Sequence, residues 1–192
     1  MALKIVTPPT SEPVSLVEAK AQLRIDWSTE DTQIGNYILA AREYCEGFQN
    51  RQYITATWDL WLDGWPSKDR FGIPLPPLQS VASIKYYDTA NVEATMAVAD
   101  YFVDDKSEPG RVVLAYGKSW PSTTLRPANG VVVRFTAGYG LAAEVPQKVK
   151  QAMLLLITLM YEKRLPVVEG KIVGEVPFAV SSLLWLDRIV PV

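Results

Sequence analysis

The chain has 192 residues, of which 48% are hydrophobic and 21% are charged, and its 19 basic and 21 acidic residues give a net charge of −2. This length is typical of one large domain or two small ones, and it allows a core without disulfides or metals. The near-neutral charge argues against a dedicated DNA-binding module, because such modules are usually strongly basic.

The chain contains no histidine, and Cys45 is its one cysteine. Ser–His and Cys–His catalysis, His-ligated zinc and internal disulfides are therefore excluded. The N-terminal residues lack the apolar run of a signal peptide. No segment reaches the roughly 18 consecutive apolar residues of a membrane span. We expect a cytoplasmic protein, or one assembled there, with no membrane contact.

The first fifty residues indicate helices. Ser15 and Glu18 fit a capping box, which predicts a helix start at Ser15. A second helix is expected to start near Ser28 or Thr29, where two acidic residues suit the helix dipole. Its apolar residues recur at spacings of three and four and predict one buried stripe: Ile34, Ile38, Ala41, Cys45 and Phe48. On that stripe Cys45 is interpreted as a small buried apolar residue.

The hydrophobic period changes to two between residues 52 and 145, which indicates strands. Residues 54–62 alternate apolar and polar side chains, and Val131 to Thr136 is the strongest strand pattern. Several short strands separated by turns predict a small antiparallel sandwich or barrel. Gly138 and Gly140 lack the spacing of a phosphate-binding loop. They are interpreted as a turn from the sheet into a third helix.

The third helix is expected after Pro146, a residue that suits a first turn. Its apolar surface is wider than one face, as in a helix that lies deep in a core or is shared with a neighbouring subunit. After Pro177, residues 181–192 are expected to form a short apolar helix or hook. A terminus this apolar is expected to dock onto a partner.

The predicted fold class is α+β, with a small helical bundle and an inserted antiparallel β domain. Residues 1–51 and 146–192 are assigned to the helical domain. Residues 52–145 are assigned to the β domain.

Asp59, Asp63, Asp104 and Asp105 are the candidate carboxylates for hydrolysis without histidine. A glycosidase pair faces across about 5–9 Å, whereas Asp59 and Asp63 on one strand would lie about 13 Å apart. The adjacent Asp104 and Asp105 point opposite ways in an extended chain. We interpret all four as solvated strand and turn residues.

The six Trp and nine Tyr residues offer a stacking platform for a sugar or a base. Basic residues near them are sparse, which disfavours a nucleic acid. Packing in the core and at subunit interfaces is the more common use of such residues. A glycan- or ligand-binding module that uses the Trp/Tyr-rich β domain is the alternative function.

Short motifs follow one another in a characteristic order along nearly the whole chain. They occupy residues 16–26, 38–46, 57–60, 76–81, 83–86, 120–121, 135–140, 146 with 149–150, 161–162, and 183–184 with 188. No single motif is specific, but the ordered series resembles the head–tail connector (adaptor, or head-completion) proteins of long-tailed bacteriophages, prophages and gene transfer agents.

The resemblance implies a structural virion protein of the neck and not an enzyme, assembled in the cytoplasm of a bacterial host. It implies a homo-oligomeric ring, usually twelve-fold, that docks under the portal protein and extends the DNA channel. The ring would present a platform to a tail-side stopper or terminator protein, and DNA would pass without sequence-specific binding. The family has no catalytic residues to carry over, and we expect no cofactor and no metal.

The C-terminal segment of such proteins commonly grips the portal, and this segment corresponds here to residues 178–192. The expected portal or subunit interface consists of Leu183, Leu184, Trp185, Leu186, Arg188, Ile189 and Val190. The family often ends in Leu-Leu-x-x-Tyr-Arg, whereas this chain has Leu-Leu-Trp-Leu-Asp-Arg at residues 183–188. The aromatic residue has therefore moved.

Overall fold

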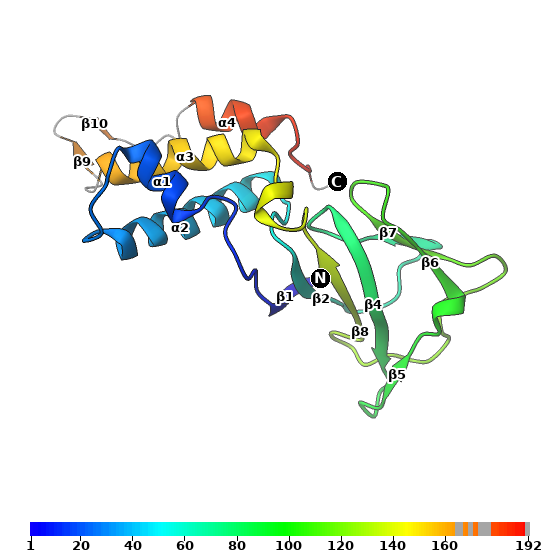
Figure 1. Cartoon of the computed structure of the whole chain (residues 1–192). Coiled ribbons are helices and arrows are strands. Elements are labelled where there is room, and N and C mark those ends of the chain that lie inside the picture. The colour runs from blue at the N-terminus through cyan, green and yellow to red at the C-terminus, as the bar shows by residue number, and fades with distance from the viewer. Residues whose placement is uncertain (164–166, 169–170, 173–177, 191–192) are drawn as a thin grey trace. The chain divides into compact units, whose positions relative to one another are not determined.

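The computed structural model describes residues 1–163, 167–168, 171–172 and 178–190. The chain divides into two compact units, a β unit of residues 1–10 and 55–139 and a helical unit of residues 11–54 and 140–192 (Figure 1). The α+β fold class is as the sequence predicts. The assignment of residues 1–10 to the helical domain is wrong, because Ala2–Thr7 is a strand, β1, that pairs with β2 of the β unit.

The helical unit contains four α-helices, a 3₁₀ turn and a short strand pair among its described residues. The helices are α1 (Leu16–Leu23), α2 (Asp31–Gln49), α3 (Gln147–Glu162) and α4 (Phe178–Trp185); the turn is η2 (Ala142–Glu144), and the strands are β9 (Val167–Val168) and β10 (Lys171–Ile172). The capping box at Ser15 is confirmed, since its side chain accepts from the Glu18 amide and Glu18 accepts from the Ser15 amide. The α2 start is later than predicted, with Glu30 as N-cap.

α3 is the central helix of this unit. It contacts α1, α2 and α4, which explains why its apolar surface is wider than one face. Its fully buried side chains pack against the predicted stripe of α2, where Cys45 is buried as expected. Burial raises the pKa of the Cys45 thiol to about 12, so the thiol stays protonated and inert.

The β unit consists of two antiparallel sheets. The larger sheet has the order β1-β2-β8-β4-β5, where β2 is Ala56–Leu62, β8 Val131–Ala137, β4 Leu78–Tyr87 and β5 Glu93–Thr95. The smaller sheet has the order β3-β7-β6, where β3 is Arg70–Gly72, β7 Arg111–Leu114 and β6 Tyr101–Asp104, and the 3₁₀ turn η1 (Val98–Asp100) precedes β6. The predicted strongest strand, β8, lies at the centre of the larger sheet.

One hydrophobic core fills the space between the two sheets. Leu60, Ile84 and Val133 face it from neighbouring strands of the larger sheet, and Tyr101 and Val112 face it from the smaller one. The opposite face of the larger sheet is polar and carries ion pairs. The central strands of the larger sheet therefore direct one set of side chains to this core and the other set to the polar face, although Val132 and Asp59 on the polar face are also buried.

Two glycine substitutions in the helical unit are expected to change the free energy of unfolding in opposite directions. Gly140 has a φ of +131°, and an added Cβ would collide with the Glu144 carboxylate. Gly47 is exposed within α2, with no atom within 4 Å of an added Cβ. We expect Gly140→Ala to lower the free energy of unfolding by more than about 1 kcal/mol and Gly47→Ala to raise it by about 0.5–1 kcal/mol. Urea unfolding followed by circular dichroism measures both; equal effects of the two substitutions would contradict this expectation.

Candidate interface at the C-terminal segment

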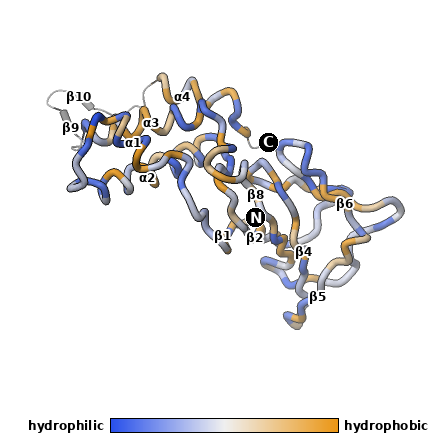
Figure 2. Tube along the Cα trace, viewed as in Figure 1, coloured by the Kyte–Doolittle hydropathy of each residue, from blue (hydrophilic) through white to orange (hydrophobic). Residues whose placement is uncertain are grey.

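The C-terminal segment, residues 178–190, packs onto the helical unit through one face of α4. Val180 and Leu184 are fully buried, and α4 contacts both α3 and α2. Figure 2 shows hydrophobic stretches along α3 and α4. The segment therefore contributes to the core of its own unit.

Side chains at the end of α2 anchor the segment by hydrogen bonds to its backbone. Gln49 donates from Nε2 to the Leu184 carbonyl at 2.7 Å, and its backbone carbonyl accepts from the Ile189 amide at 2.9 Å. Asn50 donates from Nδ2 to the Ile189 carbonyl at 2.8 Å, and Arg51 donates from Nε to the Asp187 carbonyl at 2.6 Å. The Leu184 bond satisfies a carbonyl group in the last turn of α4, and the bonds to Asp187 and Ile189 satisfy carbonyl groups of the chain that follows the helix.

Gln49 is the centre of this anchor because its side-chain amide is fully buried and both donates and accepts a hydrogen bond. While Nε2 donates to Leu184, Oε1 accepts from the Tyr53 hydroxyl at 2.7 Å. Tyr53 is also fully buried. The two bonds satisfy polar atoms that have no access to water, and losing either would cost about 1–3 kcal/mol.

Charged and aromatic contacts hold the outer side of the segment. Lys148 of α3 forms an ion pair with Asp187. The Arg188 guanidinium lies over two rings, 5.0 Å from the Phe48 centroid and 5.3 Å from the Trp185 centroid. Phe48 in turn contacts Trp185 at 6.4 Å and Tyr44 at 6.3 Å. An aromatic stripe thus runs from α2 onto α4.

The structure separates the seven expected interface residues into two groups. Leu184 is 0% exposed and belongs to the core, so its assignment to an external interface is incompatible with this packing. Leu183 and Ile189 are half-buried. The exposed members are Trp185, Leu186, Arg188 and Val190. Residues 191–192, which the expected docking tail included, lie outside the described residues.

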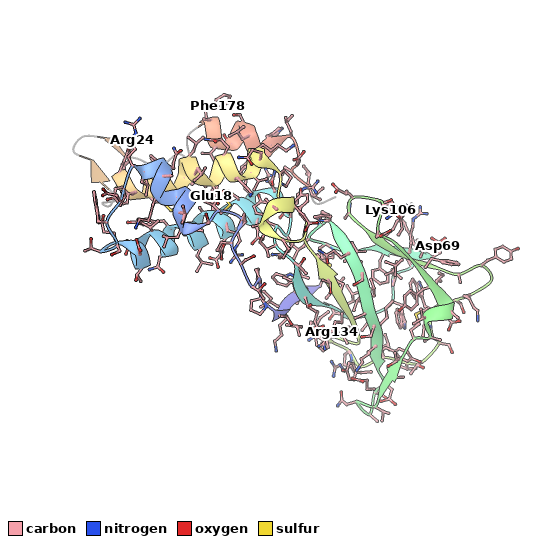
Figure 3. All side chains as sticks on the ribbon, in the orientation of Figure 1. Glu18, Arg24, Asp69, Lys106, Arg134 and Phe178 are labelled. Atoms are coloured by element: carbon pink, nitrogen blue, oxygen red, sulfur yellow. The ribbon has the colours of Figure 1, made fainter. Side chains whose placement is uncertain are left out.

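Sequence reasoning missed Phe178, the first residue of α4. Its side chain is 85% exposed and points away from α3 (Figure 3). Together with Trp185 and Leu186 it lines a shallow apolar groove, whose remaining lining residues are Ser181 and Ser182. The expected docking segment, residues 178–192, included Phe178, but the list of expected interface residues began at Leu183; a large apolar ring at the start of that segment was the available signal. We call Phe178, Trp185, Leu186 and Val190 the α4 surface.

The candidate carboxylates of the β unit are engaged in structural contacts. Asp59 binds Arg134 through two bonds of 2.8 Å, and Asp63 accepts from the Asn129 amide. Hydrogen bonds from Ser107 and Arg111 hold the pKa of Asp104 well below its usual range. A general acid needs a raised pKa instead. Asp104 is therefore unsuited to donating a proton.

The tryptophans of the β unit serve mainly as core. Trp58, Trp65 and Trp120 pack against the hydrophobic cluster, and the rings of Trp65 and Trp120 stack at 5.1 Å. Trp61 lies on the polar face, stacked on Tyr87. The rings are therefore divided between two faces and do not form one stacking platform.

In the described part of the chain, no three Asp, Glu, His or Cys side chains come together as metal ligands. None of the helices described is long and apolar enough to cross a membrane.

Comparison with known proteins relates part of the chain to one family. Residues 13–106 match the model of the phage gp6-like head-tail connector proteins. Over these residues the chain is similar to head–tail connector proteins. The matched residues include α1, α2 and strands β2 to β6, but not β1.

Solved structures similar to this chain come from particles of gene transfer agents (GTA). A chain in the neck of an empty GTA particle, computed with C6 symmetry, is 26% identical with a TM-score of 0.81. A chain in the virion of a native GTA particle is 28% identical with a TM-score of 0.81, and one in the neck of a native GTA particle, computed with C12 symmetry, is 25% identical with a TM-score of 0.80. Each match covers 100% of this chain and 97% of the other. No curated protein matches the chain.

Loss of the Gln49 side chain tests the anchor. We expect Gln49→Ala to speed amide hydrogen exchange in residues 184–190 by about five- to one-hundred-fold, because it removes the buried bonds that Gln49 makes to the Leu184 carbonyl and to the Tyr53 hydroxyl. Mass-spectrometric hydrogen exchange measures this effect. Gln33→Ala, on the exposed side of α2, is the matched control and should leave exchange there unchanged. Equal exchange in the two variants would contradict the anchoring role of Gln49.

Proposed function

We propose that this chain is the adaptor of a virion neck, where twelve copies form a ring under the portal and carry the tail. The observation that carries the proposal is the match over the full chain to neck proteins of GTA particles, one of them computed with C12 symmetry. The role is structural, and the protein performs no catalysis. The location is the head–tail junction of the particle, after assembly in the host cytoplasm.

The α4 surface is the portal-binding surface in this proposal. Its exposed apolar side chains belong to a segment that the Gln49 anchor fixes in place, so they are presented without a large entropic cost of ordering. The interface expected from the sequence is revised accordingly. Leu184 holds the segment from within the unit, while Phe178 joins Trp185, Leu186 and Val190 on the contact face.

The charge distribution supports a passage for DNA rather than a clamp. Several basic side chains in each unit are engaged by carboxylates, as in the pairs of Arg42 with Glu12, Arg111 with Asp104 and Lys20 with Asp31. The net charge is −2. Strong phosphate binding needs several free basic groups, and it would hinder the movement of DNA. The tail-side partner, a stopper or terminator protein, binds a separate surface of the ring.

Substitutions on the α4 surface test the portal contact. Deletion of residues 178–192 would also remove Val180 and Leu184 from the core, so substitutions at exposed positions are the sharper test. We expect Phe178→Glu with Leu186→Glu to reduce the amount of chain in purified particles at least about tenfold, because each carboxylate must be desolvated in an apolar contact. Quantitative immunoblotting of purified particles measures the amount.

Val17→Glu provides the matched control, because Val17 is an exposed apolar residue of α1 in the same helical unit. Its incorporation should equal that of the unchanged chain, and circular dichroism should show all variants folded. Normal incorporation of the Phe178→Glu, Leu186→Glu chain would place the portal contact elsewhere.

A further inference from the structure

β1 is an edge strand of the larger sheet, and one of its faces carries exposed apolar side chains. Leu3 lies opposite Leu60 and Ile5 opposite Trp58 in the register of β1 and β2. Directly opposed residues of an antiparallel pair share one face of the sheet, so Leu3 and Ile5 continue the face that forms the core. They are nevertheless 37% and 41% exposed, respectively.

The backbone of β1 is also open on one side. β1 is the edge strand of the larger sheet, so its outer row of amide and carbonyl groups has no partner strand. Natural edge strands are usually protected by charges, bulges or prolines. Here Lys4 is the one charged residue among residues 1–10, and Pro8 and Pro9 follow the strand. The register with β2 shifts between Ile5 and Thr7, so residues 2–5 form the regular part of this edge. An edge of this kind is suited to pairing with another chain.

A second exposed apolar patch lies at the opposite side of the same unit. β6 is an edge strand of the smaller sheet. Its Tyr101 is buried, whereas the next residue, Phe102, is 67% exposed. Val98 in η1 and Tyr116, after β7, are exposed as well, and the Ala115 amide donates to the Asp100 carbonyl, which ties these segments together. We call Val98, Phe102 and Tyr116 the β6 patch. Figure 1 shows β1 and β6 on opposite sides of the β unit.

We infer that the β1 edge of one copy of this chain packs against the β6 patch of the next copy in the ring. The inference rests on the proposed ring. A closed ring uses heterologous contacts, which require two different complementary surfaces on each subunit. The β unit has two such surfaces, both apolar and both next to an open strand edge. Burial of Leu3 and Ile5 against Phe102 completes the core face that β1 leaves uncovered.

Cysteine cross-linking in particles tests the inference. Leu3→Cys and Phe102→Cys are placed in one chain that also carries Cys45→Ala, and purified particles are treated with a short bismaleimide, which reaches beyond the Cα separation of about 7 Å that limits a disulfide. We expect a ladder of denatured species up to twelve chains, the symmetry seen in the related neck. A mixture of the two single variants should stop at dimers, and each single variant alone should stay monomeric.

Phe102→Cys with Val92→Cys is the matched control. Val92 is exposed on the turn before β5, at the edge of the larger sheet opposite to β1. The control should give at most about one fifth of the cross-linked material. If the Leu3→Cys, Phe102→Cys chain is not incorporated, Ile5→Cys with Val98→Cys tests the same contact.

The outcomes separate this inference from the proposed function. Incorporation of the variant chains without cross-linking above the control would overturn the β1–β6 contact and leave the neck role intact. Dimers from a single variant alone would indicate a two-fold contact, which also overturns it. Absence of the unsubstituted chain from particles would contradict the neck role and this inference together.

Discussion

The buried amide of Gln49 joins the end of α2 to both the C-terminal segment and the chain that leaves the helical unit. It donates to Leu184 and accepts from Tyr53, and neither bond has access to water. Because the side chain is satisfied in both directions, α4 is held at a defined position on α2 and α3. The exposed side of α4 is then a fixed apolar surface, and a fixed surface is what an adaptor needs on the side of its partner.

The β unit, like α4, combines a buried apolar face with an exposed apolar surface. The core between the two sheets is closed at its centre by β8, but it is open at the β1 edge, where apolar side chains continue beyond the cover of the smaller sheet. Large exposed apolar surfaces, such as the β1 edge and the β6 patch, are uncommon on monomeric proteins and are typical of interaction sites. In the proposed ring, these surfaces of the β unit are buried against other copies, whereas the α4 surface of the helical unit is proposed to contact the portal.

Local signals predicted much of this fold. The Ser15 capping box, the stripe of α2 and the alternation in β2 each depend on neighbours within a few residues, and the structure contains all three. β1 was assigned to the wrong domain because its identity depends on pairing with a strand more than fifty residues away. Leu183 and Leu184 are identical in chemistry, so only the packing of α4 shows which of them is buried. Phe178 was not named among the interface residues for the same reason, because only the packing of α4 shows that its side chain is exposed.

The comparisons relate the chain to head–tail connector proteins, whereas the contacts of Gln49 and the exposure of α4 identify the residues proposed to form the interface. The full-length match to GTA neck proteins makes the ring the central claim, and the copy number tests it most directly. Purified particles should be fractionated from producing cells, and this chain should be quantified against the number of particles by mass spectrometry with labelled peptide standards. The account predicts that the chain co-sediments with DNA-filled particles at twelve copies each, in agreement with the C12 symmetry of the related neck. Recovery of the chain only in the soluble fraction, while particles are present, would contradict it.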